Sequence, residues 1–433
     1  SAEALIRIEI DRIIYNLSIG RNVNHRKTDV TSPYYNGLGE MYERRFRVAE
    51  GDEAIERITF LFREFDEVVV SFSGGKDSTV TLEMALLVAE KEGKLPLTVM
   101  MLDQEAEWQA VVDYVKRVMY RDEVTPHWLQ VPIKLFNATT MDYPWLNCWD
   151  LNEEHMREKD PISIKENTYG TDRFYNMFPK YLAKHYKGKS VALLGGVRAE
   201  ESPNRRAGLT NGATYKDITY GKVYDEKQGH YVFYPLYDWS YTDIWKAIHD
   251  HSWDYCKIYD EFYRYGIAPI KMRVSNLHHE TAVDQLFYLH ELEGDTWNAL
   301  TKRLKGINQT KHMKKNEMFR ANELPFMFKD WREYRDHLCD NLIQDDGIRK
   351  KLEKKHLWMD GKFSDMNNIH EMYKTQILGI LANDFEFAKI GNFLGRPEVI
   401  NFLKFKRGVE INWNRPERDL RFIKPHQRGT THE

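Results

Sequence analysis

Cysteine is scarce in this chain, and its scarcity excludes several classes of protein. The 433 residues contain three cysteines, Cys148, Cys256 and Cys339, and no Cys-x-x-Cys pair. A disulfide framework or a zinc ribbon needs more thiols at closer spacing, so a reducing cytoplasm is the expected compartment. Three scattered thiols are also a poor ligand set for an iron–sulfur cluster, and neither a cluster nor zinc is expected as a cofactor.

Long apolar runs and a secretion signal are missing too. No stretch approaches the roughly 18 consecutive apolar residues of a membrane-spanning helix. The chain starts Ser-Ala-Glu-Ala-Leu-Ile-Arg, which lacks the basic-then-apolar form of a secretion signal. We therefore expect a cytoplasmic protein with no membrane partner, long enough for one large or two ordinary domains.

Positive charge is under-represented in the first part of the chain. Residues 1–300 carry 36 Lys and Arg against 47 Asp and Glu, whereas residues 301–433 carry 27 against 19. The basic C-terminal part predicts an anionic partner, for which nucleic acid is the candidate. A solvated lysine face is the alternative interpretation.

One stretch is strongly patterned. Three valines at 68–70 lead through Ser-Phe into Ser-Gly-Gly-Lys-Asp-Ser at 73–78, and a helix-forming segment follows. We predict a strand–loop–helix unit with phosphate-binding chemistry at the turn. Gly74 and Gly75 would let backbone N–H groups face an anion, Lys76 would add a mobile positive charge, and the serines would add hydroxyl donors.

Two details of this loop narrow its class. The carboxylate of Asp77 repels a phosphate unless it caps the helix, pairs with Lys76 or holds a metal ion such as Mg²⁺. The kinase-type Walker loop requires a glycine five residues before its Gly-Lys pair. That position is Val70 here, so the Walker pattern fails and a different nucleotide loop is indicated.

A second apolar run, at 191–194, also ends in paired glycines. Charged residues follow in the segment Val-Arg-Ala-Glu-Glu-Ser-Pro-Asn-Arg-Arg at 197–206. Arginines just beyond a strand end, such as Arg198 and Arg205, can clamp a polyphosphate or sulfate and stabilise charge on a leaving pyrophosphate. Surface salt bridges with the neighbouring glutamates are the alternative interpretation.

Two further segments concern the predicted sheet. The apolar run 97–102 reads as a buried strand that ends at Asp103. Because ligands bind at the carboxyl ends of parallel strands, Asp103 is expected to contact the nucleotide ribose, or else to cap a helix. Ser240 and Asp243, in a segment Pro-Leu-Tyr-Asp-Trp-Ser-Tyr-Thr-Asp-Ile-Trp at 235–245, predict a capped helix with a mainly structural role.

The order of these elements predicts the fold class. Strands alternate with helices from residue 53 onward, which indicates an α/β fold with a doubly wound, mainly parallel sheet. The expected domains are an N-terminal helix and arm (1–50), a catalytic domain (51–265) and a helical, basic C-terminal domain (266–433). The segment 134–190 is irregular and aromatic, and is expected to be an insertion that forms either a substrate lid or a subdomain.

The three motifs occur in this order over residues 68–245, and together they resemble the ATP pyrophosphatase and phosphoadenosine phosphosulfate (PAPS) reductase-like family of the adenine nucleotide α-hydrolase-like superfamily. The resemblance implies an enzyme that binds ATP with Mg²⁺, cleaves it between the α- and β-phosphates, transfers AMP to an acceptor and releases pyrophosphate. Sulfur transfer or nucleic-acid modification are the implied settings. The implied catalytic residues are Lys76, Arg198 and Arg205. The implied nucleotide-binding residues are Ser73, Gly74, Gly75, Lys76, Asp77, Ser78, Asp103, Gly196 and Arg198, with Asp77 also a candidate ligand of Mg²⁺.

Departures from the family pattern refine this interpretation. Sulfonucleotide reductases use a cysteine near the C-terminus, and residues 415–433 contain none, so that reaction is not expected. A Met-Arg-Val-Ser element at 272–275 resembles bacterial and phage proteins similar to immunoglobulin-binding regulator A, which are often found beside a ParB-like protein and so imply such a partner. The alternative function is a nucleotide-binding regulator that acts with this partner or with DNA, without turnover.

Overall fold

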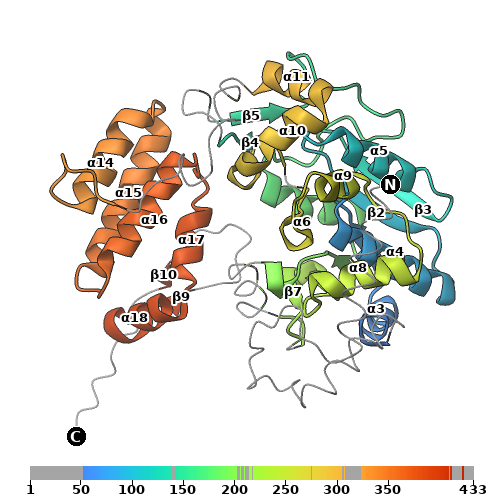
Figure 1. The fold of residues 1–433 in the computed structure, drawn as a ribbon. Helices are drawn as coiled ribbons and strands as arrows, with labels where there is room; N and C mark the ends of the chain where they lie inside the picture. The colour runs from blue at the N-terminus through green and yellow to red at the C-terminus, as the bar shows by residue number, and fades with distance from the viewer. Residues whose placement is uncertain are drawn as a thin grey trace, which may run out of the picture.

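The computed structural model describes residues 52–138, 143, 145–201, 205, 209, 214–216, 218–274, 276–304, 307, 323–408, 410–411 and 422–423. The predicted N-terminal helix and arm, residues 1–50, lie outside the described residues. Buried apolar side chains form two clusters, one drawn from residues 54–307 and the other from residues 338–403. Figure 1 shows the second cluster's helices, in orange and red, standing beside a larger α/β body.

The larger body is organised on a six-stranded sheet with the strand order β3-β2-β1-β6-β8-β7. Neighbouring strands are parallel except at the edge, where β7 runs antiparallel to β8. The prediction of an α/β fold with a doubly wound, mainly parallel sheet is confirmed. The strands are β1 (Glu67–Ser71), β2 (Leu97–Leu102), β3 (Val124–Leu129), β6 (Val191–Leu194), β7 (Gly221–Asp225) and β8 (His230–Phe233).

The path of the chain through this sheet sets the position of any ligand site. From β1 the chain moves outward through β2 to β3, and it then returns to the other side of β1 with β6. Both central strands are apolar and largely buried, as expected where elements pack on both faces. The strand order therefore reverses between β1 and β6, and the loops that leave their carboxyl ends flank the crevice where such sheets bind ligands.

Helices flank the sheet close to the predicted positions. Ser240 caps α8 and Asp243 completes the capping box, as predicted. The helices of this body are α3 (Asp52–Glu64), α4 (Lys76–Lys91), α5 (Gln109–Met119), α6 (Phe174–His185), α8 (Tyr241–Asp250), α9 (Ile258–Arg264), α10 (Leu286–Leu292) and α11 (Gly294–Arg303), with short 3₁₀ turns at 199–201, 226–228, 269–271 and 280–285. No helix among the described residues has the length and apolarity needed to cross a bilayer.

The segment after α9 packs on the α/β body. Met272 and Leu277 are buried in the first cluster, together with apolar side chains of α10 and α11. A domain boundary was predicted at residues 265 and 266, and in the structure the first cluster continues to residue 307. The second cluster begins only at Leu338.

The second cluster is a helical bundle. It is formed by α14 (Trp331–Leu342), α15 (Asp346–Phe363), α16 (Ile369–Leu381), α17 (Ala388–Leu394) and α18 (Pro397–Arg407). The prediction of a helical C-terminal part is confirmed. Two short antiparallel strands follow, β9 (Glu410–Ile411) and β10 (Phe422–Ile423).

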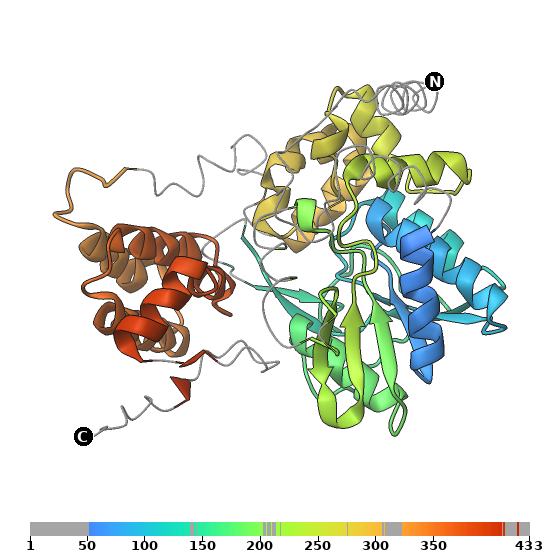
Figure 2. The same cartoon turned by 90° about the horizontal axis from the view of Figure 1, so that it is seen from below.

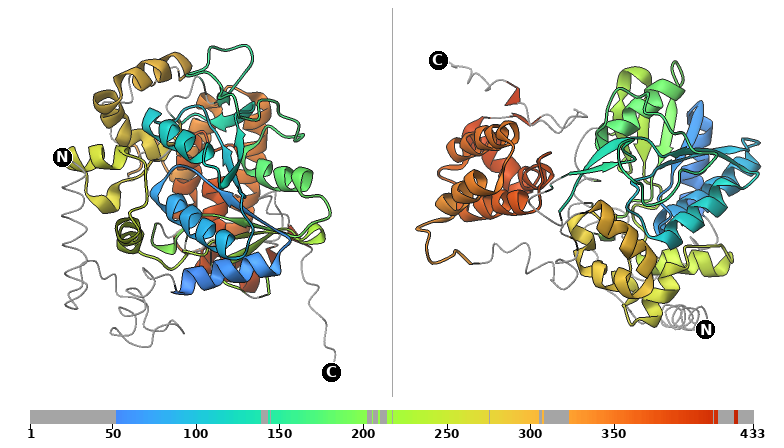
Figure 3. Two further views of the ribbon diagram at one scale, coloured as in Figure 1. Left: turned by 90° about the vertical axis from the view of Figure 1, so that its right-hand side faces the viewer. Right: turned by 90° about the horizontal axis from the view of Figure 1, so that it is seen from above.

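A hairpin from the predicted insertion joins the bundle to the sheet body. The hairpin strands are β4 (Ile133–Phe136) and β5 (Trp145–Cys148), paired antiparallel. The rings of Phe136 and Trp145 contact Phe385 of the bundle, with centroids 5.9 and 5.7 Å away. Figures 2 and 3 show this hairpin extending from the sheet body towards the bundle.

Candidate functional site

The loops that follow β1 and β6 touch at the reversal point of the sheet. A Cβ atom on Gly196 would lie 2.8 Å from the backbone nitrogen of Ser78 and 2.9 Å from the carbonyl carbon of Asp77. Those distances leave no room for a side chain, so glycine is required for the β6 loop to pack on the first turn of α4. The structure therefore gives Gly196 a packing role, whether or not it also contacts a nucleotide.

The predicted phosphate loop is held in shape by its own polar groups. Gly74 has a φ of +74°, and a Cβ there would be 2.8 Å from the Cγ1 atom of Val111. The Ser78 hydroxyl donates to the carbonyl oxygen of Gly75 (2.9 Å) and accepts from the backbone N–H of Ser73 (3.2 Å). The loop is thus folded in advance around the N-terminus of α4, where a helix favours an anion.

Three charged side chains converge beside this helix N-terminus. The carboxylate of Asp77 lies 2.5 Å from Nε of Arg198 and 3.2 Å from Nζ of Lys76. Burial raises the pKa of Asp77, but the charges of Lys76 and Arg198 outweigh it and hold this pKa below its usual value. Lys76 and Arg198 therefore share the Asp77 carboxylate, and both cations stand beside the helix N-terminus where an anionic ligand would bind.

Arg198 is the most enclosed member of this cluster. Only 3 % of the residue is exposed, and Nη1 donates to the carbonyl oxygen of Trp239 (3.1 Å) and pairs with Glu200 (3.1 Å). Burial lowers the pKa of Arg198, but the nearby carboxylates raise it by a larger amount, so the net shift of this pKa is upward. A fixed and permanently charged fork suits recognition of a phosphate group.

Arg205 lies at the edge of the same cluster. Its side chain is about half exposed and pairs with Glu201 at 2.9 Å. Glu201 also accepts from the backbone N–H of Arg198 (2.9 Å), and its carbonyl oxygen accepts from Arg273 (2.7 Å). Arg205 and Arg198 therefore both bond to the carboxylate of Glu201. The residues on either side of Arg205, at 202–204 and 206–208, lie outside the described residues.

Asp103 sits at the carboxyl end of β2, where the sequence placed it, but it faces protein groups. It is fully buried, and its two oxygens accept from Trp128, Gln130 and Arg157 side chains and from the backbone N–H of Glu105, at 2.6–3.0 Å. These partners would have to give way before a ribose could bind there. The predicted alternative of a helix cap is wrong, because Glu293 caps α5 through the N–H groups of residues 109 and 110.

A second ionic network surrounds Asp103, and sequence reasoning missed its extent. Glu105 is fully buried and pairs with Arg303 of α11 at 2.7 Å, while the guanidinium of Arg157 lies 2.6 Å from Asp103. Burial and the neighbouring Asp103 carboxylate raise the pKa of Glu107 to about 8, although Arg157 opposes this. In the sequence, the only sign of this network is the Gln-Glu-Ala-Glu run at 104–107, after β2.

Two groups that contact Lys76 were also missed. The hydroxyl of Tyr259 in α9 accepts from the backbone N–H of Lys76 at 3.1 Å. The carbonyl oxygen of Met272 accepts from Nζ of Lys76 at 3.3 Å. Both groups lie more than 180 positions further along the chain, so no local pattern pointed to them.

Asp238 and the three cysteines lie outside this cluster. Asp238 pairs with Arg57 of α3 at 2.7 Å. All three cysteines are buried, and burial raises the pKa of the Cys256 and Cys339 thiols to about 12 and about 11, and that of Cys148 well above its usual value. Buried thiols with raised pKa values are poor nucleophiles.

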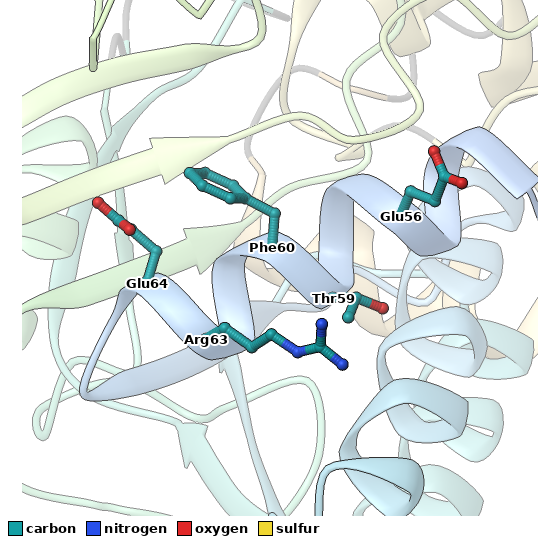
Figure 4. A pocket seen from close by; sticks show the side chains of 5 residues that line it. All are labelled: Glu56, Thr59, Phe60, Arg63 and Glu64. Carbon is teal, nitrogen blue, oxygen red and sulfur yellow. The ribbon is translucent and has the colours of Figure 1, made fainter.

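A surface pocket lies elsewhere. Figure 4 shows it along the outer face of α3, where it is lined by Glu56, Thr59, Phe60, Arg63 and Glu64. Arg63 pairs with Glu92 at 2.7 Å, and the Glu64 carboxylate bonds to Tyr215 and Lys216. None of the predicted site residues lines this pocket, so it does not bear on the loop chemistry.

Comparison with known proteins supports part of the predicted likeness. Residues 67–266 match the family model described as the phosphoadenosine phosphosulfate reductase domain. The likeness to a PAPS reductase domain that the three motifs predicted is thus confirmed over this segment. The immunoglobulin-binding regulator A-like subgroup stays a prediction.

Two curated proteins are similar to this chain. The uncharacterized protein YbdN of Escherichia coli (strain K12) is 28% identical over 272 residues, which cover 59% of this chain and 65% of YbdN. The uncharacterized protein MJ0973 of Methanocaldococcus jannaschii is 24% identical over 268 residues, which cover 61% of this chain and 54% of that protein. The chain therefore spans less than two thirds of the length of these relatives.

Solved structures give weaker likenesses. Candida glabrata FMN adenylyltransferase in complex with ATP is 15% identical, with a TM-score of 0.31 over 58% of this chain and 67% of that one. A phosphoadenylyl-sulfate (PAPS) reductase from Candida auris, as a phosphate complex, is 13% identical, with a TM-score of 0.29 over 55% of this chain and 95% of that one. At these scores neither structure bears on the chemistry of this chain.

Proposed function

We propose that this chain binds ATP at the loop of residues 73–78 and transfers its AMP moiety to an acceptor, with release of pyrophosphate. The observation that carries the proposal is the convergence of Lys76, Asp77 and Arg198 at the helix N-terminus beside the reversal point of the sheet. The β- and γ-phosphates would lie on the N-terminus of α4. Lys76 and Arg198 would then balance their charge.

The proposed step is a displacement at phosphorus. A nucleophilic oxygen of the acceptor forms a bond to the α-phosphorus, while the bond between that phosphorus and the bridging oxygen of the β-phosphate breaks. The electron pair of the broken bond leaves with pyrophosphate, where Lys76 and Arg198 stabilise it. A carboxylate or sulfate acceptor would need no proton removal, which fits a cluster whose carboxylates, Asp77 and Glu200, are already paired with Arg198.

Magnesium would arrive with the triphosphate. Among the described residues, no group of three or more His, Cys, Asp or Glu side chains is placed to hold a metal ion. The Asp77 carboxylate already pairs with two cations. These residues do not make a resident magnesium site, so Mg²⁺ would enter as part of the Mg·ATP substrate.

The proposal is tested by product analysis with α-labelled Mg·ATP. We expect labelled AMP, free or on an acceptor, together with pyrophosphate. In Lys76→Ala the rate of pyrophosphate release should fall at least about a hundredfold, because one of the two cations is lost. Lys91→Ala is the matched control, since Lys91 is exposed at the other end of the same helix. Release of ADP and phosphate at a rate unaffected by Lys76→Ala would contradict the proposal.

The resemblance also implies a regulator that binds nucleotide without turnover and acts with a ParB-like protein or with DNA. The distribution of charge along the C-terminal part indicates where DNA would bind if this second candidate function holds. The helical bundle, residues 323–408, carries 15 Lys and Arg against 14 Asp and Glu, so the basic excess of the C-terminal part lies mainly in residues 301–322, with 7 against 1. Within the bundle, Lys350, Lys351 and Lys354 of α15 are exposed.

A binding experiment separates the two candidates. Duplex binding that weakens steeply with salt, together with nucleotide binding and no pyrophosphate release when the partner is present, would favour the regulator. Substitution of Lys305, Lys311, Lys314 and Lys315 by alanine, with Arg303 kept because it pairs with the buried Glu105, should then remove duplex binding. Pyrophosphate release with no duplex binding at low salt would favour the enzyme acting on a small acceptor.

A further inference from the structure

The side chain of Tyr259 is aimed at the N-terminus of α4. The residue is 1 % exposed, and its hydroxyl oxygen accepts from the backbone N–H of Lys76 at 3.1 Å. The same oxygen lies 3.6 Å from the position that a Cβ atom on Gly75 would take. It therefore lies beside the place where an anion would meet the amide groups of this helix N-terminus.

The proton of this hydroxyl is available for a ligand. Within the part of the chain that the structure describes, no group accepts a hydrogen bond from the Tyr259 hydroxyl. Burial, with a contribution from the Asp77 carboxylate, raises the pKa of Tyr259 well above its ordinary value, so the phenol keeps its proton. A buried hydroxyl that accepts one bond and donates none has an unused donor beside a helix N-terminus.

The ring that carries this hydroxyl is firmly placed. It packs edge-on against Trp245 of α8, with centroids 5.3 Å apart at 84°, and against Phe262 of its own helix, at 6.3 Å and 90°. The ammonium of Lys76 lies 5.6 Å from the ring centroid. The hydroxyl proton can therefore rotate about the C–O bond while the ring stays in place. A donor held in this way loses little conformational entropy when it binds a ligand.

We propose that Tyr259 is a phosphate-binding residue of the nucleotide site. In the ligand-free protein its oxygen accepts from the N–H of Lys76. When a phosphate binds at the loop, the hydroxyl keeps this bond and donates its unused proton to a phosphate oxygen beside it. This inference rests on the proposed function, and it adds a donor from α9 to the two loops that the sequence motifs supplied.

The test compares ligands that carry or lack phosphate. In Tyr259→Phe we expect the affinity for Mg·ATP and for inorganic pyrophosphate, measured by calorimetry, to fall about tenfold, as for loss of one hydrogen bond to a charged group. The affinity for adenosine should stay within about twofold, because adenosine has no group for the hydroxyl to meet. Tyr255→Phe is the matched control, since it removes another buried hydroxyl of the same region, one that donates to Asp260 at 2.7 Å.

Several outcomes would overturn the inference. Unchanged or tighter pyrophosphate binding by Tyr259→Phe would do so, and so would an equal loss of affinity for adenosine, which indicates general damage. A measurement that keeps the hydroxyl is the ¹⁹F resonance of 3-fluorotyrosine placed at position 259, which should shift on addition of pyrophosphate. An unmoved resonance would also count against the inference. Failure of the unaltered protein to bind ATP would instead overturn the proposed function itself.

Discussion

Two ionic networks lie at the carboxyl edge of the same sheet, and they differ in how completely their carboxylates are buried. Beside the phosphate loop, one carboxylate, Asp77, is shared by Lys76 and Arg198. At the end of β2, Asp103 and Glu105 are each matched by an arginine, Arg157 and Arg303. The first network is open, because Asp77 and Glu200, the two carboxylates paired with Arg198, keep 18 % and 25 % of their side chains exposed. The second is closed, because Asp103 and Glu105 are fully buried.

The difference explains why similar residues serve different ends. Glu105 and Asp103 have no exposed surface, and their oxygens accept from backbone N–H groups as well as from the arginines. Such a network anchors the insertion and α11 to the sheet. Asp77 keeps 18 % of its side chain exposed, and the cations around it can be redirected to a ligand. Burial of a carboxylate at a strand end is therefore a weaker guide to a binding site than an ion pair that keeps some exposed surface.

The largest expected effect comes from breaking the closed network. Glu105→Ala leaves Arg303 without its carboxylate and removes the acceptor for the N–H groups of Trp149 and Met156. We expect the free energy of unfolding in urea to fall by about 3–5 kcal/mol. Arg205→Ala, which removes a half-exposed pair with Glu201, should cost less than about 1 kcal/mol. Equal losses of unfolding free energy in the two variants would contradict the proposed difference between the networks.

Arg198→Lys tests the open network from the side of function. Lysine keeps the charge but not the planar fork that meets Asp77, Glu200 and the Trp239 carbonyl. Pyrophosphate release should fall about a hundredfold, as when one preorganised donor is lost. A parallel urea titration checks that the protein still unfolds cooperatively. Unchanged release would mean that Arg198 is only a structural partner of Asp77.

The pH dependence of stability probes Glu107, beside the closed network. Its pKa of about 8 lies above that of the unfolded chain, so the folded protein holds a proton that the unfolded chain has released. Stability should therefore fall as pH rises, by about 2 kcal/mol between pH 6 and pH 7.5 from this group. In Glu107→Gln this part of the slope should vanish. An identical pH profile of urea midpoints in both proteins would contradict the assignment.

The smallest effect is expected at the start of α8. Ser240→Ala removes an N-cap whose hydroxyl accepts from the N–H of Asp243, and should cost about 1 kcal/mol. Trp239, whose carbonyl holds Arg198, immediately precedes this cap. We therefore expect a loss of pyrophosphate release of no more than a few fold, measured with α-labelled ATP. A loss as large as that of Arg198→Lys would show that the cap positions the guanidinium.

The features predicted from the sequence are those encoded locally. The valine run at 68–70, the glycine pair and the helix after it determine β1, the loop and α4 within about twenty residues. The capping box at Ser240 is encoded within four. The same locality made Arg198 recognisable, since a strand, two glycines and an arginine are adjacent in the chain.

The features that were missed depend on long-range packing. Asp103 reads as a ligand contact because it ends a strand, but its partners Trp128, Gln130 and Arg157 come from 25 to 54 residues away. Tyr259 reaches Lys76 across 183 positions. Hydrophobic periodicity identifies a strand that ends at a carboxylate. It carries no information on which cation a distant segment brings to that carboxylate.

The contact at Gly196 sets a limit on how this site can be altered. Because the β6 loop meets the first turn of α4 main chain to main chain, the width of the crevice there is fixed by backbone and not by side chains. In a saturation library, position 196 should tolerate no replacement, so ligand preference should not be tunable from this glycine. Variation that changes what the site accepts must come from groups that reach in from elsewhere, such as α9 and the residues beyond Arg198.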